Sequence, residues 1–274
     1  SQGVHLVLDK KFFPGDDAMM IPETSDGRVL FIVPWHNKLL MGTTDTPVKN
    51  ISLEPVALET EIRFILQTAS AYLTALPTRN DVLSVFAGLR PLAAPEDEGS
   101  NTKEISRSHK ILVSPSKLFS ILGGKWTTYR KMGEDMIDRC EKELQWKHAI
   151  SVTASLHIHG YTMQSNQSDS LYYYGSDEIL IKKIINESGN EWISEKLEIN
   201  KAQVIWAIRE EMARTVEDVL SRRTRALLLD AAESIRVAPF VAKQMAQQMN
   251  KDEDWINEQI KIFKAVAENY VLRH

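Results

Sequence analysis

The first part of the chain alternates apolar and polar residues in the two-residue period of β-strands. Turn residues separate short runs of this kind, which occupy residues 3–9, 18–24, 28–35 and 38–45. The turns between the last three runs contain SDG and HN, which favour tight antiparallel hairpins. Further strand-like runs occupy residues 81–95, 104–115 and 118–124. The pattern therefore predicts a mostly antiparallel sheet between residues 3 and 123.

Helical periodicity occurs once inside this sheet region and dominates the rest of the chain. Residues 55–74 predict a helix with Pro55 near its first turn and apolar residues on one face. After Gly124 the helical period continues, apart from an extended stretch at residues 152–160. Later helices are predicted near residues 176–188, 190–197, 201–220, 231–249 and 252–272.

Together these elements predict an α+β fold with two domains. Residues 1–155 are expected to form a partial domain of mostly antiparallel sheet with helices, and residues 156–274 an all-α domain. A length of 274 residues accommodates two domains of ordinary size. The start lacks the basic lead and long apolar core of a signal peptide and reads as a strand within a fold. We therefore expect this chain to be part of a longer protein.

Charge and cysteine usage exclude several classes of function. The formal net charge is −4, so the strongly basic footprint of a nucleic-acid-binding protein is absent. No apolar run approaches the ~18 residues that a membrane-spanning helix needs. The single cysteine, Cys140, lies within a predicted helix, which is typical of an inert thiol in a reducing compartment. His157 and His159 form a His-x-His pair, which has too few ligands for a metal site, so no metal is expected.

The stretch LFSILGGKWTTYRKMGEDMID, at residues 118–138, joins a strand, a glycine pair and an amphipathic helix. Backbone N–H groups at a helix start lack partners within the helix, and the helix dipole adds positive charge there. Gly123 and Gly124 let a ligand approach the backbone, Lys125 adds a full charge, and Thr127 adds a hydroxyl. Such a cradle suits a phosphate, a carboxylate or the electron-rich edge of a flavin ring. A tight turn with a solvated lysine has the same pattern.

Two arginines upstream add positive charge. Arg90 ends the apolar strand in FAGLRPL, and Arg107 lies on the alternating strand EISRSH. An arginine in an apolar strand is costly to bury unless a carboxylate or an anionic ligand pairs with it. Three cationic groups, with Lys125 as the third, favour an anionic substrate more than one would. The segment GTTDTP, at residues 42–47, is consistent with a capped turn or with part of the same site.

Several motifs resemble the FAD-dependent glycerol-3-phosphate dehydrogenase family of the aerobic, respiratory type. In chain order they are VPWHNKLLMGTTDTP, AGLRPL, ISRSHKILVSPS, ILGGKWTTYRKMGED and REEMARTVEDVLSRRTRALLLDA. The resemblance extends from Gly3 to the end of the chain, and REEMARTVEDVLSRRTR is its most specific part.

The resemblance implies oxidation of sn-glycerol 3-phosphate to dihydroxyacetone phosphate, with hydride passing to FAD and electrons to a quinone. In relatives, basic residues at the positions of Arg90, Arg107 and Lys125 line the substrate site, and the backbone after the glycine pair lies against the flavin ring. The expected cofactor-binding residues are therefore Gly123, Gly124, Lys125, Trp126 and Thr127. The resemblance also implies a cytoplasmic protein with peripheral attachment to the inner membrane as a further expectation.

Three features depart from the family pattern. The family usually has alanine where this chain has Gly133. Some relatives carry a histidine near the first strand as a candidate general base; the corresponding stretch LVLDKKFFP has none, and His5 lies nearby with its direction open, so no catalytic residue is assigned. The G-x-G-x-x-G fingerprint of FAD binding is absent, because no two of the 12 glycines are separated by one residue. We therefore expect a C-terminal fragment that is inactive by itself and holds FAD tightly only with the missing N-terminal FAD-binding half.

Two other functions stay open from the residues alone: a glycerol-3-phosphate oxidase that uses oxygen, and a non-enzymatic helical docking module. The charged run at residues 209–225 bears on the second. Residues four apart predict ion pairs on one helix face, namely Glu210–Arg214 and Asp218–Arg222. An apolar stripe is predicted beside them, at Met212, Val216 and Val219. This stripe favours docking of the helix onto the sheet domain over a fully solvated face.

Overall fold

The computed structural model describes residues 1–25, 27–90, 109–164, 166 and 168–272. They form two compact units that are discontinuous in sequence. The hairpin unit contains Ser1 and residues 47–49 and 89–161. The sheet–helix unit contains residues 2–46, 50–88 and 162–274. The α+β class is confirmed, whereas the domain boundary between residues 155 and 156 stays a prediction.

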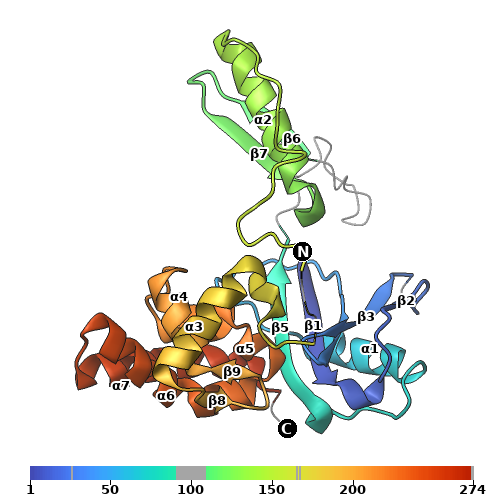
Figure 1. Ribbon diagram of the computed structural model, residues 1–274. Helices are drawn as coiled ribbons and strands as arrows, with labels where there is room; N and C mark the ends of the chain where they lie inside the picture. The colour runs from blue at the N-terminus through green and yellow to red at the C-terminus, as the bar shows by residue number, and fades with distance from the viewer. Residues whose placement is uncertain (26, 91–108, 165, 167, 273–274) are drawn as a thin grey trace. The chain divides into compact units, whose positions relative to one another are not determined.

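The sheet–helix unit is built on a five-stranded sheet in the order β2-β3-β4-β1-β5 (Figure 1). The strands are β1 (Gln2–Asp9), β2 (Met19–Ile21), β3 (Leu30–Trp35), β4 (Lys38–Gly42) and β5 (Val82–Leu89). The pairs β2–β3, β3–β4 and β1–β4 are antiparallel, as the alternating pattern predicts. His36 and Asn37 have φ values of 46° and 57° and close the β3–β4 turn in the left-handed region that tight hairpins require.

Helix α1 (Glu59–Ser70) packs on one face of this sheet. Its apolar positions Ile62, Ile65 and Ala69 are buried in one cluster with alternate residues of β1. The helix begins four residues after Pro55, later than its periodicity predicts. The reason is the N-terminal cap, in which the Glu61 carboxylate accepts the Leu58 N–H at 2.9 Å.

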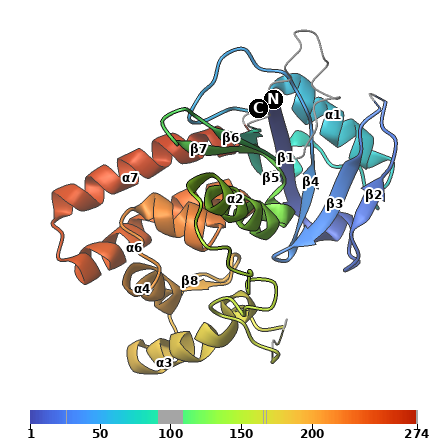
Figure 2. The same cartoon turned by 90° about the horizontal axis from the view of Figure 1, so that it is seen from above.

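Three later helices of this unit lie close to their predicted ranges, namely those predicted at residues 176–188, 231–249 and 252–272. The later helices are α3 (Glu178–Ser188), α4 (Lys201–Arg209), α5 (Ala226–Leu229), α6 (Ala231–Met249) and α7 (Glu253–Ala267), with short 3-10 turns at Tyr172–Asp177 and Glu268–Tyr270. The starts of α4, α6 and α7 are each capped by an Asn or Asp side chain that accepts a backbone N–H three residues on. Helix α7 lies alongside α6 (Figure 2), and apolar residues of both share one core.

The prediction of a helix at residues 190–197 is wrong. Strand β8 (Trp192–Ser194) pairs there with β9 (Ile199–Asn200) in a small antiparallel ribbon. Gly189 ends α3 at φ 86°, and Glu198 turns the chain at φ 54°. The apolar residues of this stretch therefore reach the core from a β-ribbon. Over so short a run, the spacing of apolar residues does not distinguish a helix from a strand.

The helix predicted at residues 201–220 is broken after Arg209. Met212 has a φ of 57° and is 74% exposed, so it does not belong to the predicted apolar stripe. Arg214 donates to the carbonyls of Ile208 and Ala213, so the predicted ion pair with Glu210 does not form on a helix face.

The chain resumes as a π-helix at Asp218–Arg223. Asp218 and Arg222 pair there at 3.0 Å, as predicted. In this wide turn the Thr224 N–H donates to the Val219 carbonyl at 2.9 Å, five residues back. Val216 and Val219 are fully buried, which confirms the rest of the apolar stripe.

The sheet and the helices of this unit touch at a buried contact. The Ser84 hydroxyl on β5 donates to the Leu227 carbonyl at 2.9 Å. Leu227 lies two residues beyond the charged run at 209–225. This contact lies in α5, just beyond the charged run, and is consistent with docking of that region onto the sheet.

The hairpin unit consists of strands β6 (His109–Val113) and β7 (Phe119–Gly123), a 3-10 turn at Trp126–Thr128, and helix α2 (Tyr129–Leu144). The two strands are antiparallel, as predicted. Among the residues that the structure describes in this unit, the side chain of Glu141 is buried, and none of the apolar side chains is. Among the residues described in either unit, no helix has the length and apolar character to cross a membrane.

Candidate functional site

The predicted cradle is a sharp turn between β7 and α2. Gly123 and Gly124 have φ values of 70° and 84°, which L side chains rarely adopt. A Cβ on Gly124 would lie 2.5 Å from the Met132 Sδ atom and 3.4 Å from the His109 Cβ atom. The glycine therefore lets the turn pass close to α2, as the sequence indicates.

Beyond the glycines, the turn presents its side chains to solvent. Lys125, Trp126 and Thr127 are all exposed, and Trp126 is 86% exposed. The Trp126 ring stacks on Tyr129 with ring centres 5.7 Å apart. The Thr128 hydroxyl donates to the Lys125 carbonyl at 2.9 Å and so fixes the turn. Within the described ranges the Lys125 ammonium has no ion-pair partner, so this charge is available to an anion.

The two predicted arginines fall in different situations. Arg90 is half-buried and directly follows β5. Its N–H donates to the Ser1 carbonyl at 2.7 Å, which extends the strand pairing. Arg107 lies outside the described residues. The structure thus joins Gly123 to Thr127 in one turn and places Arg90 in the same compact unit.

The segment at residues 42–47 is held by a buried carboxylate that sequence reasoning did not single out. Glu61 is 4% exposed, and its oxygens accept from Thr44 Oγ1 at 2.7 Å and Thr46 Oγ1 at 2.6 Å. They also accept from Gln2 Nε2 at 2.8 Å and from the Leu58 N–H. One side chain therefore ties the start of β1, the end of β4 and the start of α1 together. An acidic residue in a first helical turn was the available signal, but it is common at helix starts.

His5 faces away from α1, which resolves the direction that the alternation left open. It pairs in register with Gly42, and its ring stacks on Phe86 of β5 with ring centres 5.4 Å apart. A Cβ on Gly42 would lie 2.4 Å from the His5 Cδ2 atom. The small residue opposite therefore makes room for the imidazole on this face of the sheet.

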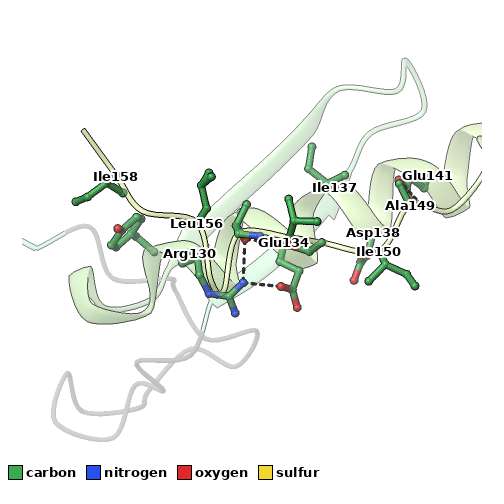
Figure 3. A pocket seen from close by; sticks show the side chains of 14 residues that line it. Arg130, Glu134, Ile137, Asp138, Glu141, Ala149, Ile150, Leu156 and Ile158 are labelled. Atoms are coloured by element: carbon green, nitrogen blue, oxygen red, sulfur yellow. Dashed lines mark hydrogen bonds and ion pairs between the residues drawn. The ribbon is translucent and has the colours of Figure 1, made fainter. Parts of the chain in front are cut away.

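A groove of about 680 Å³ runs along α2 in the hairpin unit and is bounded on one side by the segment at residues 149–158 (Figure 3). Its apolar lining includes Ile137, Ile150, Leu156 and Ile158. At one side Arg130 binds Glu134 at 2.6 Å and the Thr153 hydroxyl at 3.1 Å. An apolar lining of this kind does not suit a phosphate-bearing substrate.

Two protein-family models match this chain, and together they span residues 1–256. Residues 119–256 match the model of the C-terminal domain of alpha-glycerophosphate oxidase, and residues 1–124 match the model of FAD dependent oxidoreductases. The chain belongs to the FAD-dependent glycerol-3-phosphate dehydrogenase family. The two family models meet in β7 and the glycine turn, so the cradle lies where both parts of the family join.

Curated members of this family are similar over almost the whole chain. The mitochondrial glycerol-3-phosphate dehydrogenase of Bos taurus is 32% identical over 95% of this chain, and this chain spans 39% of its length. A probable mitochondrial glycerol-3-phosphate dehydrogenase of Dictyostelium discoideum is 32% identical over 99% of this chain and 46% of its own length. The chain therefore spans less than half of these family members.

A solved structure in this family has a similar fold. The glycerol-3-phosphate dehydrogenase from Bacillus halodurans, complexed with FAD, matches with a TM-score of 0.79 and 26% identity. The match covers 98% of this chain and 57% of that one.

Proposed function

We propose that this chain is the substrate-facing and flavin-facing part of an enzyme that oxidises sn-glycerol 3-phosphate to dihydroxyacetone phosphate. The observation that carries the proposal is the exposed glycine turn with Lys125, in a chain that matches this family along most of its length. FAD, when bound, supplies the acceptor for the hydride from the secondary alcohol, and a quinone then takes the electrons.

Lys125, Arg90 and Arg107 are proposed to bind the anionic end of the substrate. The exposed ammonium of Lys125 supports this role, because no carboxylate among the described residues neutralises it. A phosphate carries two charges near neutral pH, so several cations are needed to bind it against water. Losing one charge-assisted bond should weaken binding by roughly 1.5–3 kcal/mol.

The residues from Gly123 to Thr127 fit a flavin ring. The missing Cβ of Gly124 makes room for Met132 on the helix side of the turn. The side chains of Lys125, Trp126 and Thr127 are exposed, so the outer side of the turn is open to a planar ring. Backbone N–H groups at the start of the turn before α2 suit the electron-rich edge of the ring. The contribution of this chain is therefore to orient the ring edge and to place Lys125 beside it.

Tight FAD binding is proposed to need a further FAD-binding half. The absence of a buried apolar side chain in the described part of the hairpin unit supports this, because helix α2 gains little stability by itself. Such a half would cover apolar side chains that are now exposed, Ile150 at 86% among them. The proposed location is cytoplasmic with peripheral membrane attachment, where a quinone is within reach.

An oxidase that passes electrons to oxygen is the second candidate, and one matched family model carries that description. The relatives named above are named dehydrogenases, which favours an acceptor other than oxygen, and we propose a quinone in that role. A non-enzymatic docking module is not favoured, because the matched family members are named as enzymes.

The test uses this chain and the longest natural polypeptide that contains it. The chain alone should bind FAD weakly in a fluorescence titration, and the longer polypeptide should reduce a quinone analogue when sn-glycerol 3-phosphate is added. Arg90→Ala and Lys125→Ala should each lower kcat/KM about tenfold or more, as the loss of a charge-assisted bond implies. Unchanged kinetics in both variants would remove them from the site, and submicromolar FAD binding by this chain would overturn the need for a second half.

A further inference from the structure

Three side chains of the types that bind metals in proteins meet at the end of α2, the opposite end of this helix from the glycine turn. Asp138 and Glu141 are three residues apart on the helix. Gln145 then ends the helix in the left-handed region at φ 54°, and the Trp146 N–H donates to the Glu141 carbonyl at 2.9 Å. This reversal brings His148 back, so that its Nδ1 atom lies 2.8 Å from Glu141 Oε2.

The geometry of these three side chains suits a shared ion. One ligand atom from each of Asp138, Glu141 and His148 lies within 4.8 Å of the other two. Ligands that bind one transition-metal ion at about 2.0–2.2 Å lie about 3–4 Å apart, so small side-chain adjustments suffice.

Burial and charge also suit a bound cation. Glu141 already accepts hydrogen bonds from His148 and from the Ala149 N–H at 3.3 Å, so the unpaired charge is that of Asp138. Glu141 is 8% exposed, which makes it the buried residue among those described in its unit. Asp138 has no hydrogen-bond or ion-pair partner within the described parts of the chain. Glu141 lies in the last turn of α2, where the helix dipole disfavours negative charge. His148 supplies at most one positive charge for the two carboxylates.

A neighbouring acidic cluster shows the contrast. Glu134, Asp135 and Asp138 also lie close together, but Lys131 binds Glu134 at 2.6 Å and Asp135 at 2.9 Å. Hydrogen bonds from Lys131 and then from Arg130 lower the pKa of Glu134 to about 2. Protein cations therefore already neutralise Glu134 and Asp135, so Asp138 is the carboxylate of that cluster left without a partner among the described residues.

We propose that Asp138, Glu141 and His148 bind a first-row transition-metal dication, with Zn²⁺ as the best match. One imidazole nitrogen and two carboxylates favour such an ion over Mg²⁺ or Ca²⁺, which prefer oxygen ligands alone. Binding requires the His148 Nδ1 proton to move to the other ring nitrogen or to leave. Solvent completes the coordination, because Asp138 and His148 are exposed.

The bound ion would fasten the chain reversal after α2. Ala149 and Ile150 follow His148 directly and line the groove along the helix. Holding His148 therefore holds one wall of that groove. The sequence alone did not indicate this site, because His148 lies seven residues from Glu141 and meets it through the turn at Gln145.

The experiment titrates the tag-free chain, stripped with chelator, with Zn²⁺ by calorimetry and with Co²⁺ by visible absorption. One ion should bind per chain, and His148→Ala and Asp138→Asn should each weaken binding by about tenfold or more. Asp138 is exposed, so its variant tests the site even if a change at Glu141 prevents folding. His157→Ala is the matched control, an exposed histidine of the same unit, and should bind as the parent does.

Three results would overturn the proposal. The first is the absence of saturable Zn²⁺ binding at ion concentrations up to about 100 μM. The second is unchanged affinity in His148→Ala and Asp138→Asn. The third is loss of binding in Cys140→Ser, which would assign the ion to the nearby thiol.

Discussion

Glu61→Gln tests the buried network that holds the segment at residues 42–47. The substitution keeps the shape of the side chain but removes its charge and turns one acceptor oxygen into a donor group. At least one of the donors Thr44, Thr46, Gln2 and the Leu58 N–H then loses its acceptor. A hydrogen bond to a charged group contributes roughly 1.5–3 kcal/mol, and such bonds within one network are not additive. We expect the free energy of unfolding to fall by about 2–4 kcal/mol.

The assay is urea unfolding followed by far-UV circular dichroism, with hydrogen exchange at residues 42–47 as a local readout. Glu59→Gln is the matched control, because Glu59 lies on the same helix and pairs with Arg79 at the surface. Exposed pairs contribute about 0–1 kcal/mol, so this control should change stability little. If the two variants differ by less than about 0.5 kcal/mol, or exchange at residues 42–47 is unchanged, the network does not hold this segment.

Three further outcomes follow from single contacts. Gly42→Ala should lower stability by about 1–3 kcal/mol in urea unfolding, because its Cβ would lie 2.4 Å from His5. Hydrogen bonds from Arg236 lower the pKa of Glu233 to about 2, below its ordinary 4.5, so the stability that this group contributes is present above pH 4.5 and is lost as the pH falls towards 2. Glu233→Gln should flatten that acid limb, and an unchanged limb would contradict this account. Burial lowers the pKa of His36 below its usual 6.5, so stability should fall as the pH drops below 6.5, and His36→Asn should reduce that fall in unfolding curves.

Local patterns predicted much of the fold. The SDG and HN turns with flanking apolar runs indicate the β2–β3 and β3–β4 hairpins. Helix α6 has the predicted bounds, residues 231 to 249, because an Asp cap and a left-handed Asn250 mark its ends. The glycine pair at 123 and 124 also forms the predicted turn, since its positive φ values require glycine there.

Long-range and short-period features could not be predicted in the same way. Trp192 to Ser194 form a strand because Glu198 turns the chain back, and a run of three residues has no diagnostic period. The role of Glu61 depends on Gln2, 59 residues away in the chain, so no local pattern reveals it. The exposure of Met212 follows from one left-handed residue inside an apparently regular helical repeat.

The π-helix at Asp218–Arg223 has a consequence for how chains of this family vary in length. A turn closed over five residues contains one residue more than an α-turn, so it is the natural place for a single insertion in a helix. Relatives with a regular helix here would need a gap of one position when aligned with this chain, and every residue after the gap would keep its place in the core. Removing one residue between Asp218 and Arg223 should therefore be tolerated better than the same deletion within α6.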